Sequence, residues 1–292
     1  MSAPTPPLPT RWHDHELVWG TRTHVVAVVN ATPDSFSGDG VAGDPCRAAE
    51  LAAAAVRDGA GIVDVGAEST RPGHRPVPAE EEIGRLLPVL AAVRAAVAVP
   101  ISVDTTKAAV AEAALGAGAD LVNDVRGLTG DPDMAAVVAR RGVPVVVMHD
   151  AAPDGNEDLV TSIVRELARR LDRAVAAGVT AELVVLDPGF GFGKDWRQNL
   201  ELLRRLGELR VLGRPILAGT SRKGTIGRVL GLPERDRLEG TAATVALAIA
   251  GGADLVRVHD VKAMARVARM ADAVVRGAPQ EARSWTTGRL EE

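Results

Sequence analysis

Eight short apolar runs alternate with eight longer segments of helical period along most of the chain. The runs are rich in Val, Ile and Leu and occupy residues 25–30, 62–67, 101–104, 121–125, 145–148, 184–187, 216–219 and 255–258. The helical segments are rich in Ala, Leu and Arg and occupy residues 46–58, 80–96, 108–117, 133–140, 159–177, 200–209, 240–250 and 262–276. Repeated strand–helix units predict a parallel sheet, and eight of them form a closed barrel. We therefore predict an α/β chain with a single-domain (β/α)8, or TIM-barrel, architecture.

The two ends of the chain lie outside this alternation. Residues 1–24 begin with a Pro-rich arm, and residues 12–24 could form a short hairpin that closes the bottom of the barrel. We predict a barrel over residues 25–277 and a C-terminal tail over residues 278–292.

Composition limits the classes of partner. The net charge of −4 gives no general attraction to nucleic acid or to anionic membranes, and aromatic residues, at 2%, are too few for base-stacking platforms. No apolar run approaches the roughly 20 residues of a membrane-spanning helix, and the single Cys46 cannot form an intramolecular disulfide. We expect a cytoplasmic protein that binds small molecules and neither nucleic acid nor membrane.

Polar side chains follow or interrupt the strand runs, where barrel enzymes carry their chemistry. Asp64, Asp104, Asn123 and Asp187 supply hydrogen-bond acceptors that suit a ring with several N–H donors, such as an amino-pyrimidinone. Any one of them could instead cap the following helix or bond to its own turn. Their recurrence from strand to strand favours a binding site.

Basic side chains follow or interrupt the last two runs. Arg257 and His259 are two residues apart and are expected to face the same way, as a cationic pair suited to a diphosphate. Ser221, Arg222 and Lys223 are expected beside them. Asn30, at the end of the first run, could bond to the anion or ligate a bridging Mg²⁺. A diphosphate ester of a donor-rich ring is the ligand that these residues indicate.

Seven motifs resemble the signatures of the dihydropteroate synthase family, in the family's order. They are NATPDSFS (30–37), DVGAESTRPG (64–73), SVDT (102–105), VNDV (122–125), DPGFGFGK (187–194), SRK (221–223) and RVHDV (257–261). The resemblance extends from residue 25 to about residue 273. It implies an enzyme of folate biosynthesis that displaces pyrophosphate from a pterin diphosphate with 4-aminobenzoate, and that forms a homodimer. Because pyrophosphate is a good leaving group once its charge is neutralised, we expect an SN1-like course.

The resemblance also assigns residues to substrates. The implied pterin site comprises Asp64, Asp104, Asn123, Val125, Met148, Asp187, Gly219 and Lys223. The implied diphosphate site comprises Asn30, Thr70, Arg257 and His259, with Mg²⁺ held at Asn30. The implied 4-aminobenzoate site comprises Thr70, Arg71, Pro72, Phe192, Ser221 and Lys223. The implied catalytic residues are Asp104, Asp187, Lys223, Arg257 and His259.

Other interpretations of the motifs are less consistent with the residues. The GFGFGK stretch lacks the length and the following Ser or Thr of a phosphate-binding P-loop. A methyltetrahydrofolate methyltransferase would share a pterin-binding barrel, but the STRP and RVH stretches suit a diphosphate better. A sugar-phosphate isomerase or lyase would need a Lys or Glu base that these motifs do not supply. A non-catalytic pterin-binding module stays open, because the stretch 150–158 is shorter than in the family.

Overall fold

Eight parallel strands form the centre of the computed structural model, which describes residues 6–31, 44–69, 76–152, 155 and 157–277. They are β3 (His24–Asn30), β4 (Ile62–Gly66), β5 (Ile101–Asp104), β6 (Leu121–Asp124), β7 (Val145–Met148), β8 (Val184–Asp187), β9 (Leu217–Ala218) and β10 (Leu255–Val258). The strand order is β8-β7-β6-β5-β4-β3-β10-β9. A parallel bridge between Leu186 and Ile216 joins the two outer strands. The predicted (β/α)8 barrel is thereby confirmed.

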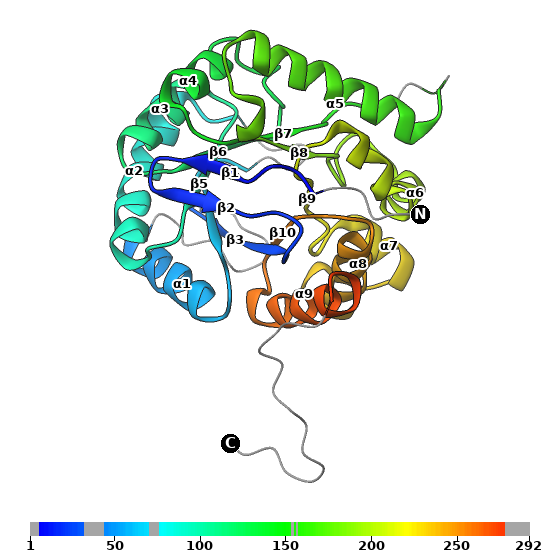
Figure 1. Cartoon of the computed structure of the whole chain (residues 1–292). Helices are drawn as coiled ribbons and strands as arrows, with labels where there is room; N and C mark the ends of the chain where they lie inside the picture. The colour runs from blue at the N-terminus through cyan, green and yellow to red at the C-terminus, as the bar shows by residue number, and fades with distance from the viewer. Residues whose placement is uncertain (1–5, 32–43, 70–75, 153–154, 156, 278–292) are drawn as a thin grey trace.

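Helices surround the strands on the outside of the barrel (Figure 1). They are α1 (Pro45–Arg57), α2 (Ala79–Ala96), α3 (Ala108–Gly116), α4 (Met134–Arg141), α5 (Leu159–Ala176), α6 (Trp196–Arg204), α7 (Gly224–Leu230), α8 (Leu238–Ala250) and α9 (Val261–Val275). Short 3₁₀ helices lie at η1 (Ala181–Leu183), η2 (Leu206–Leu212) and η3 (Glu234–Asp236). None of the helices in these described ranges is both long enough and apolar enough to cross a membrane.

Strand burial explains why the runs are apolar throughout. All four residues of β7 are buried, and the same holds for β5, β6 and β8. Their side chains point either into the barrel interior or outward against the helices, so both faces must be apolar until the strand ends. In-register pairing of Asp104 with Gly66 and Asn123, and of Met148 with Asp187, places these strand ends side by side. The site residues therefore share one end of the barrel.

Two helix boundaries differ from the sequence prediction. Helix α6 begins at Trp196 rather than near residue 200, because Asp195 and Gln198 form a reciprocal capping box at its start. Residues 206–209, predicted as the end of this helix, belong instead to the 3₁₀ helix η2 (Leu206–Leu212). Helix α7 was not predicted at all, since its seven residues, GTIGRVL, contain two glycines and no clear helical period.

A two-stranded hairpin, β1 (Thr10–Trp12) and β2 (His15–Leu17), covers the other end of the barrel (Figure 1). Thr10 Oγ1 donates a 2.7 Å hydrogen bond to the carbonyl of Glu182, just before β8. His15 Nε2 lies 3.1 Å from Asp120 Oδ1, just before β6. These contacts close the end where the strands begin, so the opposite end is left for a substrate.

Trp12 makes the hairpin part of the barrel core. Its side chain is only 4% exposed. We expect Trp12→Ala to lower the free energy of unfolding by about 3–5 kcal/mol, because a buried indole is replaced by a cavity. Denaturant unfolding followed by circular dichroism would measure the change. The matched control is Leu8→Ala, which truncates a side chain that is 65% exposed. Equal unfolding midpoints for the two variants would contradict a core role for the hairpin.

Candidate active site

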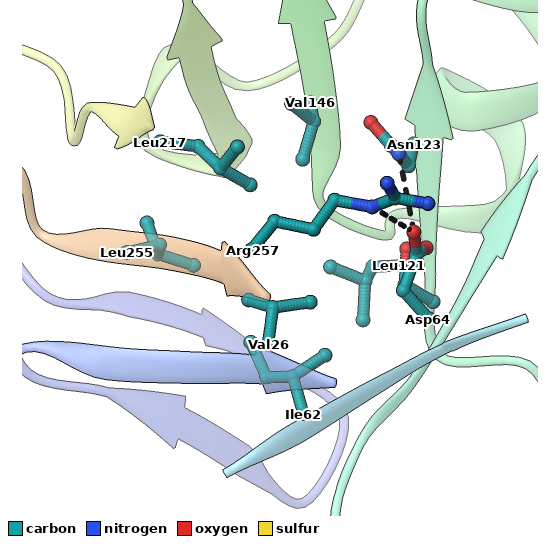
Figure 2. Close-up of a pocket in the computed structure, with 10 residues that line it drawn as sticks. Val26, Ile62, Asp64, Leu121, Asn123, Val146, Leu217, Leu255 and Arg257 are labelled. Atoms are coloured by element: carbon teal, nitrogen blue, oxygen red, sulfur yellow. Dashed lines mark hydrogen bonds and ion pairs between the residues drawn. The ribbon is translucent and has the colours of Figure 1, made fainter. Parts of the chain in front are cut away.

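Carboxylate and amide side chains from neighbouring strands meet inside the barrel near the strand ends (Figure 2). Asp64 of β4, Asp104 of β5 and Asn123 of β6 are all buried. Asn123 Nδ2 donates to Asp64 Oδ2 across 3.3 Å. Asp64 lies two residues before the end of β4, in register with Ser102 rather than with Asp104, so it lies deeper in the barrel than Asp104.

Figure 2 shows Arg257 of β10 reaching across the barrel to Asp64. Its Nε lies 2.6 Å from Asp64 Oδ2, and its Nη2 lies 2.8 Å from Asp104 Oδ2. The other carboxylate oxygens, Asp64 Oδ1 and Asp104 Oδ1, are buried and have no hydrogen-bond partner among the described residues. A buried acceptor without a donor costs free energy. Both oxygens are therefore available to a ligand that brings N–H groups into the barrel.

Two aspartates of this cluster, Asp104 and Asp187, have raised pKa values. Burial raises the pKa of Asp104 to about 7; Arg257 opposes this shift and the nearby Asp64 carboxylate adds to it. Burial also raises the pKa of Asp187, although the main-chain N–H of Gly189 donates to its Oδ1 across 2.7 Å. Burial thus brings the pKa of Asp104 toward the neutral range.

The segment after β8 brings Phe192 and Lys223 together. Lys223 Nζ lies 4.4 Å from the centre of the Phe192 ring, which is within the range of a cation–π contact. Lys223 itself immediately precedes helix α7. An aromatic face and an ammonium group thus lie beside the carboxylates, where they could hold an aromatic acid.

His259 differs from the sequence prediction. It follows the last residue of β10, and its Nδ1 lies 3.0 Å from Ser221 Oγ. Burial, together with the positive charge of Arg257, lowers the pKa of His259 to about 3. The lowered pKa favours the neutral form of His259, which leaves Arg257 as the charged member of the predicted pair.

The remaining predicted site residues lie at the same end of the barrel where they are described. Asn30 is the half-buried last residue of β3, and Met148 is the buried last residue of β7. Val125 directly follows β6, and Gly219 directly follows β9. Three predicted residues, Thr70, Arg71 and Pro72, lie outside the described residues. No cluster of three or more His, Cys, Asp or Glu side chains suited to a metal occurs within the described ranges.

The sequence analysis missed a buried ion-pair cluster beside the site. Lys107 Nζ lies 2.6 Å from both Glu68 Oε2 and Glu82 Oε2, and Glu82 is fully buried. Glu82 also accepts from Thr105 Oγ1 across 2.8 Å. Glu82 sits in the acidic first turn of α2, a pattern typical of an exposed helix start, so the sequence carried no signal of its burial.

Lys194 is the second residue whose role was missed. It is buried, and its Nζ lies 3.0 Å from His149 Nδ1. Burial lowers the pKa of Lys194 to about 8 and that of His149 to about 3, so Lys194 is the charged member of the pair at neutral pH. Its place in a glycine-rich motif suggested only a comparison with phosphate loops.

Solved structures of similar fold carry the ligands that this geometry suggests. A dihydropteroate synthase from Clostridium difficile, crystallised in the presence of pteroic acid, matches with a TM-score of 0.85 at 46% identity and covers 89% of this chain and 99% of that one. The dihydropteroate synthase from Xanthomonas albilineans in complex with 7,8-dihydropteroate matches with a TM-score of 0.81 at 40% identity, over 89% of this chain and 96% of that one.

Comparison of the sequence with known proteins points to the same enzymes as the comparison of structures. The family model described as pterin binding enzyme matches residues 26–259. The dihydropteroate synthase of Bacillus subtilis is 45% identical over 259 residues, which cover 89% of this chain and 91% of that protein. The chain therefore belongs to the pterin-binding enzyme family and, within it, to the dihydropteroate synthases.

Proposed function

We propose that this chain catalyses the condensation of 6-hydroxymethyl-7,8-dihydropterin pyrophosphate with 4-aminobenzoate, giving 7,8-dihydropteroate and pyrophosphate. The observation that carries the proposal is the pair of buried oxygens Asp64 Oδ1 and Asp104 Oδ1, next to the guanidinium of Arg257. Neither oxygen has a hydrogen-bond partner in the part of the chain that the structure describes. The two oxygens can accept hydrogen bonds from a donor-rich ring, and the guanidinium can bind the diphosphate attached to that ring.

The pterin ring would bind deepest in the barrel. The polar edge of the ring would face Asp104, Asn123, Asp187 and Asp64 Oδ1. Asp64 Oδ2 would meanwhile keep its contacts with Asn123 and Arg257. The walls of this pocket would be formed by Val125, Met148, Gly219 and Lys223. Because the acceptors are buried, a ring that lacked the matching N–H groups would leave them unpaired and would bind far more weakly.

The diphosphate would extend from the ring toward the mouth of the barrel, from the Arg257 guanidinium beside Asp64 and Asp104 to His259 and Asn30. Thr70, outside the described residues, would add to this site. A guanidinium suits a phosphate because it can donate two parallel hydrogen bonds. Neutral His259 would donate a hydrogen bond rather than contribute charge. As the C–O bond breaks, its electron pair passes to the diphosphate, and Arg257 stabilises the charge that develops there.

Mg²⁺ fits this site as an ion carried by the substrate. The described residues hold no cluster that could bind it alone, but Asn30 offers an amide oxygen at the end of β3. Mg²⁺ commonly takes one or two protein oxygens and completes its shell with phosphate and water. Bound in this way, the ion would neutralise charge on the leaving diphosphate.

Loss of the diphosphate leaves positive charge on the pterin methylene group, in an SN1-like course. The carboxylates of Asp104 and Asp187 would stabilise this cation electrostatically. The amine of 4-aminobenzoate then forms the C–N bond and releases a proton to solvent. Phe192, Ser221 and Lys223, together with Thr70, Arg71 and Pro72, would orient the aminobenzoate; the ammonium of Lys223 suits its carboxylate.

A single assay tests this proposal. The purified protein is mixed with the pterin diphosphate, 4-aminobenzoate and Mg²⁺, and dihydropteroate and pyrophosphate are measured together. We expect equal amounts of both products. Pterin binding without release of pyrophosphate would instead identify a non-catalytic pterin-binding protein, and methyl transfer from methyltetrahydrofolate would identify the methyltransferase alternative.

Pterin affinity should depend on pH through Asp104. An ionised carboxylate accepts from N–H groups at both oxygens, whereas a protonated one loses an acceptor. Since burial raises the pKa of Asp104 to about 7, we expect affinity to be constant above that pH and to fall by up to about tenfold for each pH unit below it. Calorimetric titration with a pterin between pH 5.5 and 8.5 measures this; a flat profile would contradict the role of Asp104.

We further propose a cytoplasmic homodimer. Exposed apolar side chains lie on α8 and α9, namely Leu247 at 58%, Met270 at 65% and Val274 at 73% exposure, and such side chains are common at interfaces between copies. Sedimentation should give twice the chain mass of 30.4 kDa, and Met270→Glu should shift the protein toward one chain. A wild-type protein that sediments as one chain at micromolar concentration would exclude the dimer.

A further inference from the structure

The side-chain ammonium of Lys194 binds main-chain carbonyl groups in the segment that follows β8. Its Nζ lies 3.0 Å from the carbonyl oxygen of Phe192, 3.1 Å from that of Gly189 and 3.3 Å from that of His149, as well as 3.0 Å from His149 Nδ1. A buried ammonium is stable only when such acceptors surround it. The four contacts join residues 189–192 to the end of β7, so the side chain acts as a tie between two loops of the site.

The geometry of residues 189–193 explains why such a tie is needed. Gly189, Gly191 and Gly193 all have left-handed backbone conformations, with φ of 73°, 80° and 62°. A Cβ at Gly189 would lie 1.9 Å from the carbonyl oxygen of His149, and one at Gly193 would lie 2.4 Å from that of Ala151. The close approach of the two loops therefore requires glycine, and these glycines contribute no side chains that could fix the segment.

Phe192 depends on this tie more than Asp187 does. Asp187 is the last residue of β8 and pairs with Met148 of β7, so the sheet fixes its position. Phe192 lies outside the sheet; its N–H donates to the carbonyl of Gly189 across 3.1 Å, and that same carbonyl accepts from Lys194. Loss of the ammonium would thus move the Phe192 ring more than it moves Asp187, which keeps its strand pairing even though its Oδ1 accepts from the N–H of Gly189.

We infer that Lys194 is a positioning residue for the second substrate: by binding the carbonyls of Gly189 and Phe192 it holds the Phe192 ring against Lys223. It touches neither substrate. The inference rests on the proposed function, because it assigns Phe192 and Lys223 to the aminobenzoate side of the site.

The variant Lys194→Met keeps the length of the side chain and removes its hydrogen bonds. We expect the KM for 4-aminobenzoate to rise about ten- to a hundredfold, because misplacing an orienting group by about 1 Å has effects of this size. The KM for the pterin diphosphate should change by less than about threefold, since the sheet holds Asp187. Equal changes in both KM values, or no change in either, would overturn the inference.

A double-variant cycle separates positioning from general loss of structure. If Lys194 acts through Phe192, then K194M added to F192A should raise the aminobenzoate KM no further than F192A alone. Additive effects would mean that Lys194 acts by another route. If K194M does not fold, Lys194→Arg is measured in its place. We expect the same selective rise in the KM for 4-aminobenzoate, and no rise would count against the inference.

Arg170 of α5 provides the matched control. It is also a buried cation that binds main-chain carbonyls, those of Met148 and Arg126, on the neighbouring loops. Arg170→Met should lower the free energy of unfolding and affect the pterin side, but leave the KM for 4-aminobenzoate unchanged. If R170M raises that KM as much as K194M does, the selectivity assigned to Lys194 is refuted.

Hydrogen exchange tests Lys194 independently of catalysis. The N–H groups of Gly191 and Phe192 are bonded to Asn199 Oδ1 and to the carbonyl of Gly189, and both should exchange faster in K194M than in the wild type. If the wild-type protein makes no dihydropteroate, the proposed function fails, and hydrogen exchange alone then tests the role of Lys194. Faster exchange in K194M that is confined to residues 189–193 would support the tie, and unchanged exchange would overturn it.

Discussion

Replacing Arg257 by methionine should reduce kcat/KM for the pterin diphosphate by about 10³-fold, because it removes the cation that stabilises the leaving diphosphate. The same change leaves the buried carboxylates of Asp64 and Asp104 without their ion-pair partner. The free energy of unfolding should therefore fall by about 3–5 kcal/mol as well. Initial rates of pyrophosphate release and denaturant unfolding measure the two effects.

Arg94→Met is the control for Arg257→Met. The Arg94 side chain is 29% exposed against 23% for Arg257, and it too binds a carboxylate, Asp120 Oδ2, at 2.8 Å. This pair lies at the end of the barrel where the strands begin, because Asp120 Oδ2 also accepts from the N–H of Ile101, the first residue of β5. R94M should lower stability but keep kcat/KM within about twofold of the wild type. If both variants lose activity in proportion to their stability, Arg257 has no special part in the reaction.

Replacing Asp104 by asparagine should weaken pterin binding by about 10²-fold. The substitution keeps the shape of the side chain but replaces one acceptor oxygen by a donor, so an N–H group of the ring would face another N–H group. The variant should also lose the pH dependence near 7 that the carboxyl group gives to the wild type. Calorimetric titration with a pterin at pH 6 and pH 8 measures both effects.

Asp254→Asn is the matched control for Asp104→Asn. Asp254 is also a buried aspartate whose pKa is raised by burial, and its Oδ1 likewise has no partner among the described residues. It precedes β10, at the opposite end of the barrel, where its Oδ2 accepts from the N–H of Ile216. Pterin affinity should be the same in D254N as in the wild type. A similar loss in both variants would mean that any buried aspartate supports binding indirectly.

The sequence predicted the barrel because strand and helix periods follow from which faces are buried. Runs such as 145–148 are apolar at every position, and the structure buries every one of them. Helix α7 escaped prediction because its form depends on packing rather than on its own residues: Gly240 and Ile226 pack so closely that a Cβ on Gly240 would lie 2.3 Å from Ile226 Cγ2.

The sequence predicted which residues form the site, but not how they pair with one another or which of them are charged. The motifs placed Asp64, Asp104 and Arg257 at one end of the barrel, and the structure brings these three together. Their pairing, and the neutral state of His259, depend on burial and on distances between strands far apart in the sequence. The same is true of Lys194, whose four acceptors come from three positions in two loops.

A crystal structure with the pterin diphosphate bound would test the central claim most directly. The account predicts the ring inside the barrel, with its N–H groups within about 3.2 Å of Asp104 and Asp187, and the diphosphate bonded to Arg257 at the mouth. A ring bound outside the barrel, or a diphosphate remote from Arg257, would contradict it.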